Sequence, residues 1–424
     1  MSAERYDIVI FGATGFTGQF VVEEVARVAD EEKGLTWAVA GRSMEKLQKI
    51  LENASKRTSK DLENTPIIIC DTSSDSSLQE MAEKAKIVLN CVGPYCFHGE
   101  KVVKACIEGG SSHIDISGEP QYLENMQLLY NGKAKEADVY IIGSCGFDSI
   151  PADMGVLYAQ RQFEGDVNSI ESFLDVHAGP SGFVGNATTL ESAVYGFAHA
   201  GELAGLRKSL YPEPLPKYKY KAPKRGAVFT GEVVNKYCVD FMGSDKSVVY
   251  RTQRYNYEVK KQRPVQYSPY MCLKGISDVI GMMIFGLVFA VLCKFSFGRS
   301  LLIKYPSFFT FGGFKKGGPT MKQIQETSFT MTFVSKGWST KLEDLSAQHD
   351  SAPDMLKITK VVGPELGYVT TPICMVQSAV VLLKEKDKLP KGGGVFTPGM
   401  AFADTTLISR LNSHNVLFQE VSSN

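Results

Sequence analysis

Three glycines close to the start of the chain have the spacing of a phosphate-binding turn. Gly12, Gly15 and Gly18 directly follow the apolar run Tyr6–Phe11 and open an amphipathic stretch. In such a turn the first glycine permits a tight bend, the second lets backbone N–H groups approach a diphosphate, and the third lets helix and sheet pack closely. The free N–H groups at the start of the helix favour an anion. We therefore expect a dinucleotide to bind here, with candidate contacts at Gly12, Thr14, Gly15, Phe16, Thr17 and Gly18. The alternative is a glycine-rich turn without a ligand, which the strand–turn–helix context disfavours.

The end of the next apolar run indicates which dinucleotide binds. Domains that bind NAD commonly place an acidic residue about 20 residues after the glycines, where it holds the ribose 2′-hydroxyl. Here the run Thr36–Ala40 is followed by Gly41, Arg42 and Ser43, without a carboxylate. Arg42 could bind a 2′-phosphate, and Ser43 could add a hydroxyl donor. We predict NADP; the alternative is that Arg42 only solvates a strand end.

Other strand ends should border the same crevice, because ligands bind beyond the carboxyl ends of parallel strands. Asp71 follows the apolar run Pro66–Cys70 and suits an adenine or ribose edge. Asn90, Val92 and Gly93 lie in a small-residue turn that could pass close to the nicotinamide-side ribose. The alternatives are helix capping for Asp71 and a plain turn at Gly93.

A proton donor is less clearly marked in the sequence. Tyr95 follows the nicotinamide-side turn and Asp148 lies where two domains should meet, so both are candidate catalytic residues. The alternatives are packing for Tyr95 and a cap or an interdomain hydrogen bond for Asp148, since catalytic roles depend on geometry. Further polar residues near predicted strand ends are His98, Asp115, Ser117 and Glu119. The six histidines and nine cysteines show no ligand spacing, so we predict no metal site.

The elements that would position these residues alternate regularly over the first 150 residues. Short runs rich in Val and Ile alternate with amphipathic stretches, which predicts a parallel sheet covered by helices on both faces. Six such strands make a complete doubly wound Rossmann domain over residues 1–150. The predicted strands are Tyr6–Phe11, Thr36–Ala40, Pro66–Cys70, Ile87–Val92, His113–Ile116 and Val139–Ile142.

The pattern changes after residue 150. Ile170–His177, Gly231–Met242 and Phe329–Val334 are predicted strands, separated by long polar connections. They indicate a second, α+β domain over residues 151–371, for substrate binding or dimerisation. Pro372–Glu385 is an almost uniformly apolar stretch with proline in the first turn of a predicted helix.

Charge is distributed unevenly along the chain. The 424 residues carry 46 basic and 46 acidic side chains, and this neutral total gives no reason to expect nucleic-acid binding. Residues 1–150 nevertheless have a net charge of −8, from 15 basic and 23 acidic side chains. Residues 206–320 hold 20 basic and 6 acidic side chains, a net charge of +14.

The basic region surrounds a long uncharged run, Val279–Cys293 (residues 279–293). Its fifteen residues fall short of the roughly 20 that a spanning helix needs. Basic and aromatic residues alternate downstream in Lys294–Arg299 and Lys304–Lys316. This favours monotopic insertion into a membrane or lipid-droplet surface. The alternative is a buried or dimer-interface helix.

Several segments together resemble a known family. They are Phe11–Gln19, Trp37–Ser43, Leu89–Tyr95, Ile114–Glu119, Gly146–Asp153, Gly243–Asp245, Arg251–Tyr255, Arg299–Gly312 and Gly393–Gly399. Over essentially its whole length the chain resembles the saccharopine dehydrogenase-like oxidoreductases. The resemblance implies an NADP-type Rossmann domain, an α+β domain, and a C-terminal helix and tail, residues 372–424, that return to the first domain. It also implies an association with lipid droplets and membranes, and relatives among the bacterial trans-acting enoyl reductases of glycolipid synthesis. The substrate-binding residues of the true saccharopine reductases have no matching motif here.

Taken together, these features predict an NADP(H)-dependent oxidoreductase that acts on a hydrophobic or lipid-linked substrate. The nine cysteines are scattered and odd in number, and a strand begins at Tyr6; both features predict an intracellular protein. We expect it at the cytosolic face of a membrane or lipid droplet, with a homodimer as a further option. The competing interpretation is a catalytically inactive NADP-binding scaffold protein at lipid surfaces, which the missing acid–base signature supports.

Overall fold

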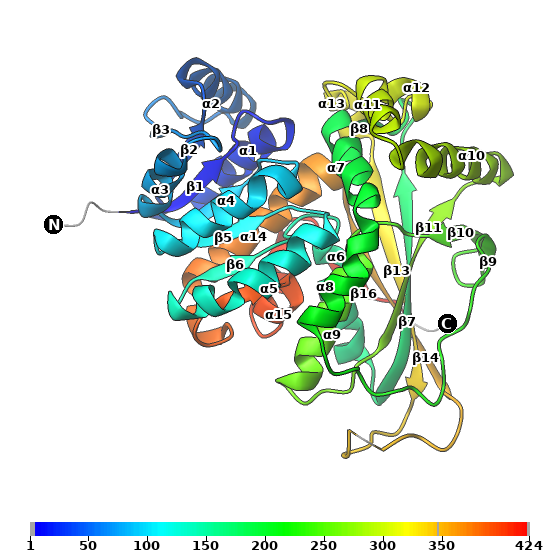
Figure 1. Cartoon of the computed structure of the whole chain (residues 1–424). Helices are drawn as coiled ribbons and strands as arrows, with labels where there is room; N and C mark the ends of the chain where they lie inside the picture. The colour runs from blue at the N-terminus through cyan, green and yellow to red at the C-terminus, as the bar shows by residue number, and fades with distance from the viewer. Residues whose placement is uncertain (1–4, 346, 422–424) are drawn as a thin grey trace.

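Two large sheets stand side by side in the molecule (Figure 1). The computed structural model describes residues 5–345 and 347–421. The first sheet has seven parallel strands in the order β15-β6-β5-β4-β1-β2-β3. These strands are β1 (Tyr6–Phe11), β2 (Trp37–Gly41), β3 (Ile67–Ile69), β4 (Ala85–Asn90), β5 (Ser112–Asp115), β6 (Tyr140–Ile142) and β15 (Gly394–Phe396).

Helices alternate with these strands as the hydrophobic pattern predicts, so the Rossmann fold is confirmed. They are α1 (Phe16–Glu31), α2 (Met44–Thr58), α3 (Asp75–Glu83), α4 (Tyr95–Glu108) and α5 (Pro120–Glu136). The six predicted strands form, with ends shifted by a few residues. The sheet has seven strands rather than the expected six, because β15 from the C-terminal segment pairs with β6. A three-residue strand that begins with glycine carries too little pattern to be detected locally.

The second sheet is mixed and confirms the predicted α+β region. Its order is β16-β14-β13-β7-β11-β10-β9, and within it β7 and β11 are the parallel pair. Its strands are β7 (Asp166–His177), β9 (Phe229–Gly231), β10 (Lys236–Asp240), β11 (Gln266–Leu273), β13 (Ser328–Trp338), β14 (Met355–Pro364) and β16 (Leu417–Glu420). A small parallel pair, β8 (Gly185–Asn186) and β12 (Phe314–Lys315), lies apart from both sheets.

The remaining helices join or flank the sheets. They are α6 (Ile150–Gln162), α7 (Ala187–Ala198), α8 (Leu203–Leu210), α9 (Asp245–Glu258), α10 (Ile276–Cys293), α11 (Ser296–Lys304), α12 (Pro306–Phe309), α13 (Met321–Gln325), α14 (Thr371–Lys384), α15 (Pro398–Phe402) and α16 (Leu407–Ser413). A π-helical turn, Leu366–Thr370, leads into α14. Short 3₁₀ turns occur at Ala200–Glu202 and Lys386–Lys388.

One hydrophobic core runs continuously through both sheets. It extends from Ile8 of β1 through Met154 of α6 to Phe333 of β13, all of them buried. The packing of α6 on β13 is close: a Cβ at Gly155 would lie 2.3 Å from the Phe333 ring. Helix α6 therefore joins the two sheets through a shared core.

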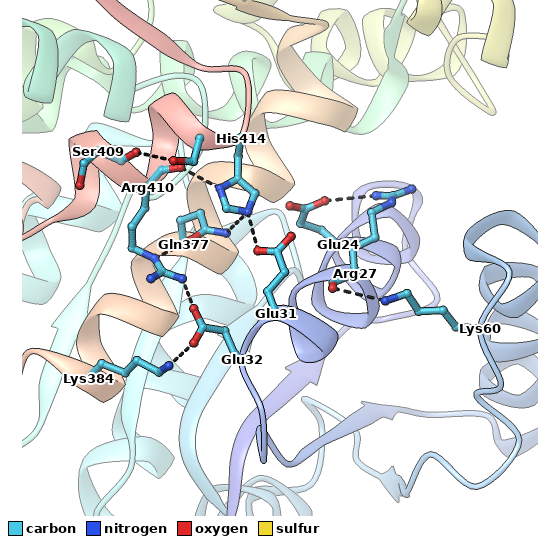
Figure 2. Close-up of polar contacts among 11 residues, drawn as sticks. Glu24, Arg27, Glu31, Glu32, Lys60, Gln377, Lys384, Ser409, Arg410 and His414 are labelled. Carbon is cyan, nitrogen blue, oxygen red and sulfur yellow. Dashed lines mark hydrogen bonds and ion pairs between the residues drawn. The ribbon is translucent and has the colours of Figure 1, made fainter.

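Helix α14 returns to the first sheet, as the family resemblance implies. It packs on α1 and also contacts β4 and β5. Polar contacts at the end of α1 add to this packing (Figure 2): Glu32 accepts hydrogen bonds from Lys384 and Arg410. Nearby, the Nε2 atom of His414 lies 3.0 Å from a carboxylate oxygen of Glu31.

The end of the chain differs from the expectation that residues 372–424 pack on the first domain. Strand β16 pairs antiparallel with β14 of the second sheet, with Phe418 opposite Val361. The C-terminal segment is therefore divided between the two sheets. Such a pairing joins residues far apart in sequence, so no local pattern signals it.

Candidate functional site

The glycine turn has the geometry that its sequence predicts. Gly12 lies in the left-handed region, with φ +83°, and a Cβ there would lie 2.7 Å from a side-chain methyl of Val92. A Cβ at Gly18 would lie 2.2 Å from the carbonyl oxygen of Gly12, and one at Gly15 would lie 3.1 Å from it. Gly12 and Gly18 therefore have no room for a side chain. The turn is thus kept open for a close backbone approach.

The start of α1 is free to receive an anion. Gly15 is its N-cap and offers no side-chain acceptor, and the first helical turn contains no acidic residue. The first N–H groups of a helix need an acceptor from outside the helix, and they sit at its positive end. The turn and the helix start together fit a diphosphate. Thr14 and Phe16 also line the cleft described below, whereas Thr17 is half-buried within the first turn.

Arg42 lies at the carboxyl end of β2 with an exposed side chain. Within residues 5–345 and 347–421 its guanidinium forms no hydrogen bond or ion pair, which leaves it available for a 2′-phosphate. The Ser43 hydroxyl accepts from the backbone N–H of Lys46 at 3.4 Å and so caps α2. Asp71 accepts from the N–H and hydroxyl of Ser73, which with the nearby Arg42 lowers the pKa of its carboxyl.

The turn after β4 is shaped by Asn90. This side chain is completely buried, and its carbonyl oxygen accepts from the N–H of Val92 at 3.0 Å. Asn90 therefore fixes the turn from inside rather than facing the crevice. Val92 and Gly93 are half-buried, and the side chain of Val92 lies beside Gly12. Of the three predicted residues, Val92 and Gly93 remain the candidates for direct contact with the cofactor.

The two candidate catalytic residues differ in environment. The Tyr95 hydroxyl donates to the carbonyl oxygen of Asn90 at 2.9 Å, and its ring packs on Tyr122 at a centroid distance of 5.5 Å. Burial raises the pKa of Tyr95 well above its usual value. The phenol is thus engaged in the core, which favours the packing alternative for Tyr95.

Asp148 has the more accessible side chain. Among the described residues its carboxylate forms no hydrogen bond, although protein surrounds it closely enough that desolvation raises its pKa. A Cβ at Gly118 would lie 3.3 Å from a carboxylate oxygen of Asp148, so this oxygen lies next to the segment that follows β5. A carboxyl group with a raised pKa retains its proton to a higher pH, as a proton donor must. Asp148 is therefore the stronger candidate.

A cleft of about 700 Å³ separates the glycine turn from the second domain. Thr14, Phe16 and Gln19 line it from the first domain. From the opposite side it is lined by residues of α7, of α11 and of the loop after β12. The cleft thus places second-domain side chains across from the diphosphate-binding turn.

Comparisons with known proteins agree with this geometry. The family model of the saccharopine dehydrogenase NADP binding domain matches residues 8–142. The saccharopine dehydrogenase-like oxidoreductase of Rattus norvegicus is 52% identical, and the match covers 99% of this chain and 98% of that protein. The chain belongs to the saccharopine dehydrogenase-like oxidoreductase family. Its cofactor is therefore NADP, bound by the Rossmann domain.

More distant relatives extend this finding. A protein of Caenorhabditis elegans named lipid droplet localized protein is 39% identical, with 98% of each chain covered. Among solved structures, the saccharopine dehydrogenase (L-Glu forming) of Saccharomyces cerevisiae matches with a TM-score of 0.54 at 11% identity. That match covers 98% of this chain and 99% of the yeast chain. At this identity it shows the shared two-domain fold and nothing about the substrate.

In this member of the family, sequence reasoning missed two buried carboxyl groups near Asp148. Asp153 accepts from the Thr252 hydroxyl at 2.8 Å and from the Gly399 N–H at 2.7 Å, and burial raises its pKa to about 7. Asp245 is also buried; burial first, then the charges of Asp148 and Asp153, raises its pKa well above the usual range. These residues come from segments that carry the family resemblance, so the sequence held a signal, but only the fold brings them together.

The same carboxyl groups do not form a metal site by their geometry. In the part of the chain that the structure describes, no group of three or more His, Cys, Asp or Glu side chains is arranged to hold a metal ion. The predicted lack of a metal remains a prediction.

Proposed function

We propose that this NADP-binding oxidoreductase acts on a hydrophobic or lipid-linked substrate at the surface of a membrane or lipid droplet. The observation that carries the proposal is the position of α10. This apolar helix is exposed on its outer face, and it leads directly into α11, which lines the cleft opposite the glycine turn. A substrate held in the lipid would thus have a short path to the cofactor.

Helix α10 lies at the edge of the molecule (Figure 1), and exposed apolar side chains occur along its length. Its inner face, through Phe285 and Phe289, packs on Leu190 and Val194 of α7. Of its 18 residues, Val279 and Cys293 are buried. The exposed apolar side chains are Ile276, Ile280, Met283, Ile284, Leu287 and Val291. A contiguous apolar face of this kind marks an interaction surface.

The residues around α10 suit a lipid interface better than a second protein. Residues 271–320 hold one acidic side chain, Asp278, and six basic side chains, four of which lie outside the cleft lining. Basic side chains attract anionic headgroups, and aromatic rings favour the interfacial region. Protein interfaces, in contrast, are depleted in lysine at their centres. Exposed aromatic residues follow α10 at Phe295, Phe297, Tyr305, Phe308 and Phe311. The name of the Caenorhabditis elegans relative supports the same surface.

The chemistry would be divided between the cofactor and the chain. Bound NADPH supplies a hydride. The glycine turn and Arg42 would hold its phosphates, and Asp148 would hold a proton beside the segment after β5. The shared core between the domains would keep these groups in register.

Flotation with vesicles tests the lipid surface. We expect Met283→Asp/Leu287→Asp to reduce co-flotation with phosphatidylcholine–phosphatidylserine vesicles at least tenfold, because both side chains are exposed on the outer face of α10. Val259→Asp, at an exposed apolar residue just after α9, is the matched control and should float as the parent does. If the double variant floats normally but changes from dimer to monomer in sedimentation, α10 is a dimer interface and the lipid proposal is wrong.

Turnover tests the enzyme. NADPH oxidation in the presence of fractionated cellular lipids should identify an active fraction. Asp148→Asn should then lower kcat at least a hundredfold with an unchanged Kd for NADPH, since removal of a proton donor typically costs 10²–10⁴-fold. Tight NADPH binding without turnover in any fraction would instead support the scaffold interpretation.

A further inference from the structure

Two lysines of the basic region 271–320 line the cleft, and neither has a role in the fold or in the hydride and proton transfer described above. Lys304 is the last residue of α11, and Lys316 follows β12; both side chains are exposed and line the cleft. Within residues 5–345 and 347–421 neither ammonium group forms a hydrogen bond or an ion pair. The Lys304 ammonium lies 5.3 Å from the centre of the Tyr305 ring. The two lysines are the basic residues of the cleft lining, and Glu191 is its acidic residue.

The backbone holds Lys316 next to the glycine turn. Gly318 has a φ of +69°, and a Cβ there would lie 2.5 Å from the Phe16 ring, so this loop rests directly on the first turn of α1. Strand β12 fixes the other side, because Lys315 pairs with Asn186 of β8. Asn186 in turn caps α7 through the N–H of Thr188. Lys316 therefore lies on a constrained segment.

Lys304 is held by the packing of α11. Leu302 is completely buried and belongs to one hydrophobic cluster with Leu190 and Val194 of α7. Arg299 donates to the carbonyl oxygen of Cys293 at 2.9 Å and so ties α11 to the end of α10. Helix α11 and the loop after β12 are constrained separately, and each brings one ammonium group to the cleft.

The opposite wall of this cleft is the start of α1. Its free N–H groups and its positive helix end attract an anion from one side. Lys304 and Lys316 lie on the second-domain side, and with Glu191 they leave the cleft a net charge of +1. A diphosphate between the two walls would meet donors on both sides.

We propose that Lys304 and Lys316 bind the diphosphate of NADP from the side opposite the glycine turn. The second domain then completes the cofactor site. The same chemistry would suit the phosphate headgroup of a lipid, so the experiment distinguishes these two sources. Binding of the diphosphate by these lysines does not depend on which substrate is reduced.

The test is the affinity for NADPH, measured by fluorescence titration at fixed ionic strength. Each charge-assisted hydrogen bond to phosphate lost should weaken binding by about tenfold. We expect Lys304→Ala and Lys316→Ala each to raise the Kd about tenfold, and the double variant to raise it further. Lys315→Ala is the matched control, because Lys315 is an exposed neighbour that does not line the cleft. Its Kd should stay within twofold of the parent value.

A second arm uses vesicles of phosphatidylcholine with phosphatidic acid. We expect the double variant to float with these vesicles within threefold of the parent. An unchanged NADPH Kd in the double variant, with a normal melting temperature, overturns the proposal. A loss of phosphatidic-acid binding without a change in NADPH affinity also overturns it, since the lysines would then bind a lipid phosphate. Either result leaves the flotation test of Leu287 on α10 unaffected, so the two proposals can fail separately.

Discussion

Helices α10 and α14 have similar composition and opposite surroundings. Helix α10, with 18 residues, and the 19-residue helical stretch Leu366–Lys384 that contains α14 are both long and apolar enough to cross a membrane, by length and composition alone. Of the apolar window in α10, 11% is buried inside the molecule, whereas 83% is buried in the window Leu366–Lys384 that contains α14. An apolar stretch therefore predicts that a helix will leave water, but it does not say whether protein or lipid will cover it.

The difference follows from what each helix is placed against. Helix α14 follows β14 and lies on the first sheet, where it contacts α1, β4 and β5. Helix α10 follows β11, and its main contacts are with α7 and α11. The first domain covers α14, whereas α7 and α11 cover α10 on one side. The basic and aromatic residues beside α10 are the reason why we propose a lipid surface as its cover.

The largest effect should come from placing the same charge in each helix. Val380 of α14 is 1% exposed, whereas Leu287 of α10 is 69% exposed. We expect Val380→Asp to prevent folding or to lower the free energy of unfolding by more than about 4 kcal/mol, because a carboxylate would be buried without a partner. Leu287→Asp should change it by less than about 0.5 kcal/mol. Urea unfolding followed by circular dichroism measures both.

Two results would break this comparison. A folded Val380→Asp protein of near-parent stability would mean that α14 is not held in the core as described. A strongly destabilised Leu287→Asp protein would mean that the outer face of α10 is covered by protein in solution.

The next-largest expected effect is a pH dependence of the free energy of unfolding. It should come from buried carboxyl groups of the core, and binding to lipid through α10 should not share it. Burial raises the pKa of Asp153, beside the C-terminal segment, to about 7, and that of Asp115 to about 6. A carboxyl whose pKa is raised in the folded state destabilises the fold once it must ionise there. Its contribution to the free energy of unfolding is therefore complete below about pH 4 and is lost as the pH rises through 6 to 7. At about 1.4 kcal/mol per pKa unit, Asp153 alone would account for on the order of 4 kcal/mol.

We therefore expect urea unfolding to show a less stable protein at pH 8 than at pH 5. Asp153→Asn should reduce this difference, because the amide oxygen can still accept from Thr252 and Gly399. Vesicle flotation through α10 should stay constant over the same pH range. An Asp153→Asn protein with the parent's pH profile would show that this carboxyl does not titrate in the window.

The smallest effect concerns the polar contacts that join α1 to the C-terminal segment (Figure 2). Burial alone would raise the pKa of Glu32, but hydrogen bonds from Lys384 and Arg410 outweigh it and lower the pKa. The contribution of Glu32 is thus present above its usual pKa and lost as the pH falls through the lowered value. Glu32→Gln should lower the free energy of unfolding by about 1 kcal/mol at pH 7, and less in 1 M salt.

Glu52→Gln is the matched control for this change. Glu52 is exposed on α2 and should contribute nothing measurable to stability. Equal effects of the two substitutions in thermal unfolding would argue that the contacts of Glu32 are no stronger than those of an isolated surface charge.

The sequence alone determined the first domain well, for a physical reason. Parallel strands buried on both faces must be continuous apolar runs, and a diphosphate turn must be glycine where the backbone packs too closely for a side chain. Both signals are local, so β1 to β6, the helices between them and Gly12, Gly15 and Gly18 could be predicted. The basic residue in place of a carboxylate after β2 likewise marked Arg42 without any tertiary information.

The tertiary structure alone decided how distant segments meet. It added β15 to one sheet and β16 to the other, and it turned Tyr95 into the core while leaving Asp148 accessible. It also brought Lys304 and Lys316 across from Thr14, although they are far from it in the sequence. Pairing, burial and the walls of a cleft depend on contacts between residues far apart in sequence. A hydrophobic pattern reports only that a residue prefers to leave water, so α10 and α14 look alike until the fold covers one and exposes the other.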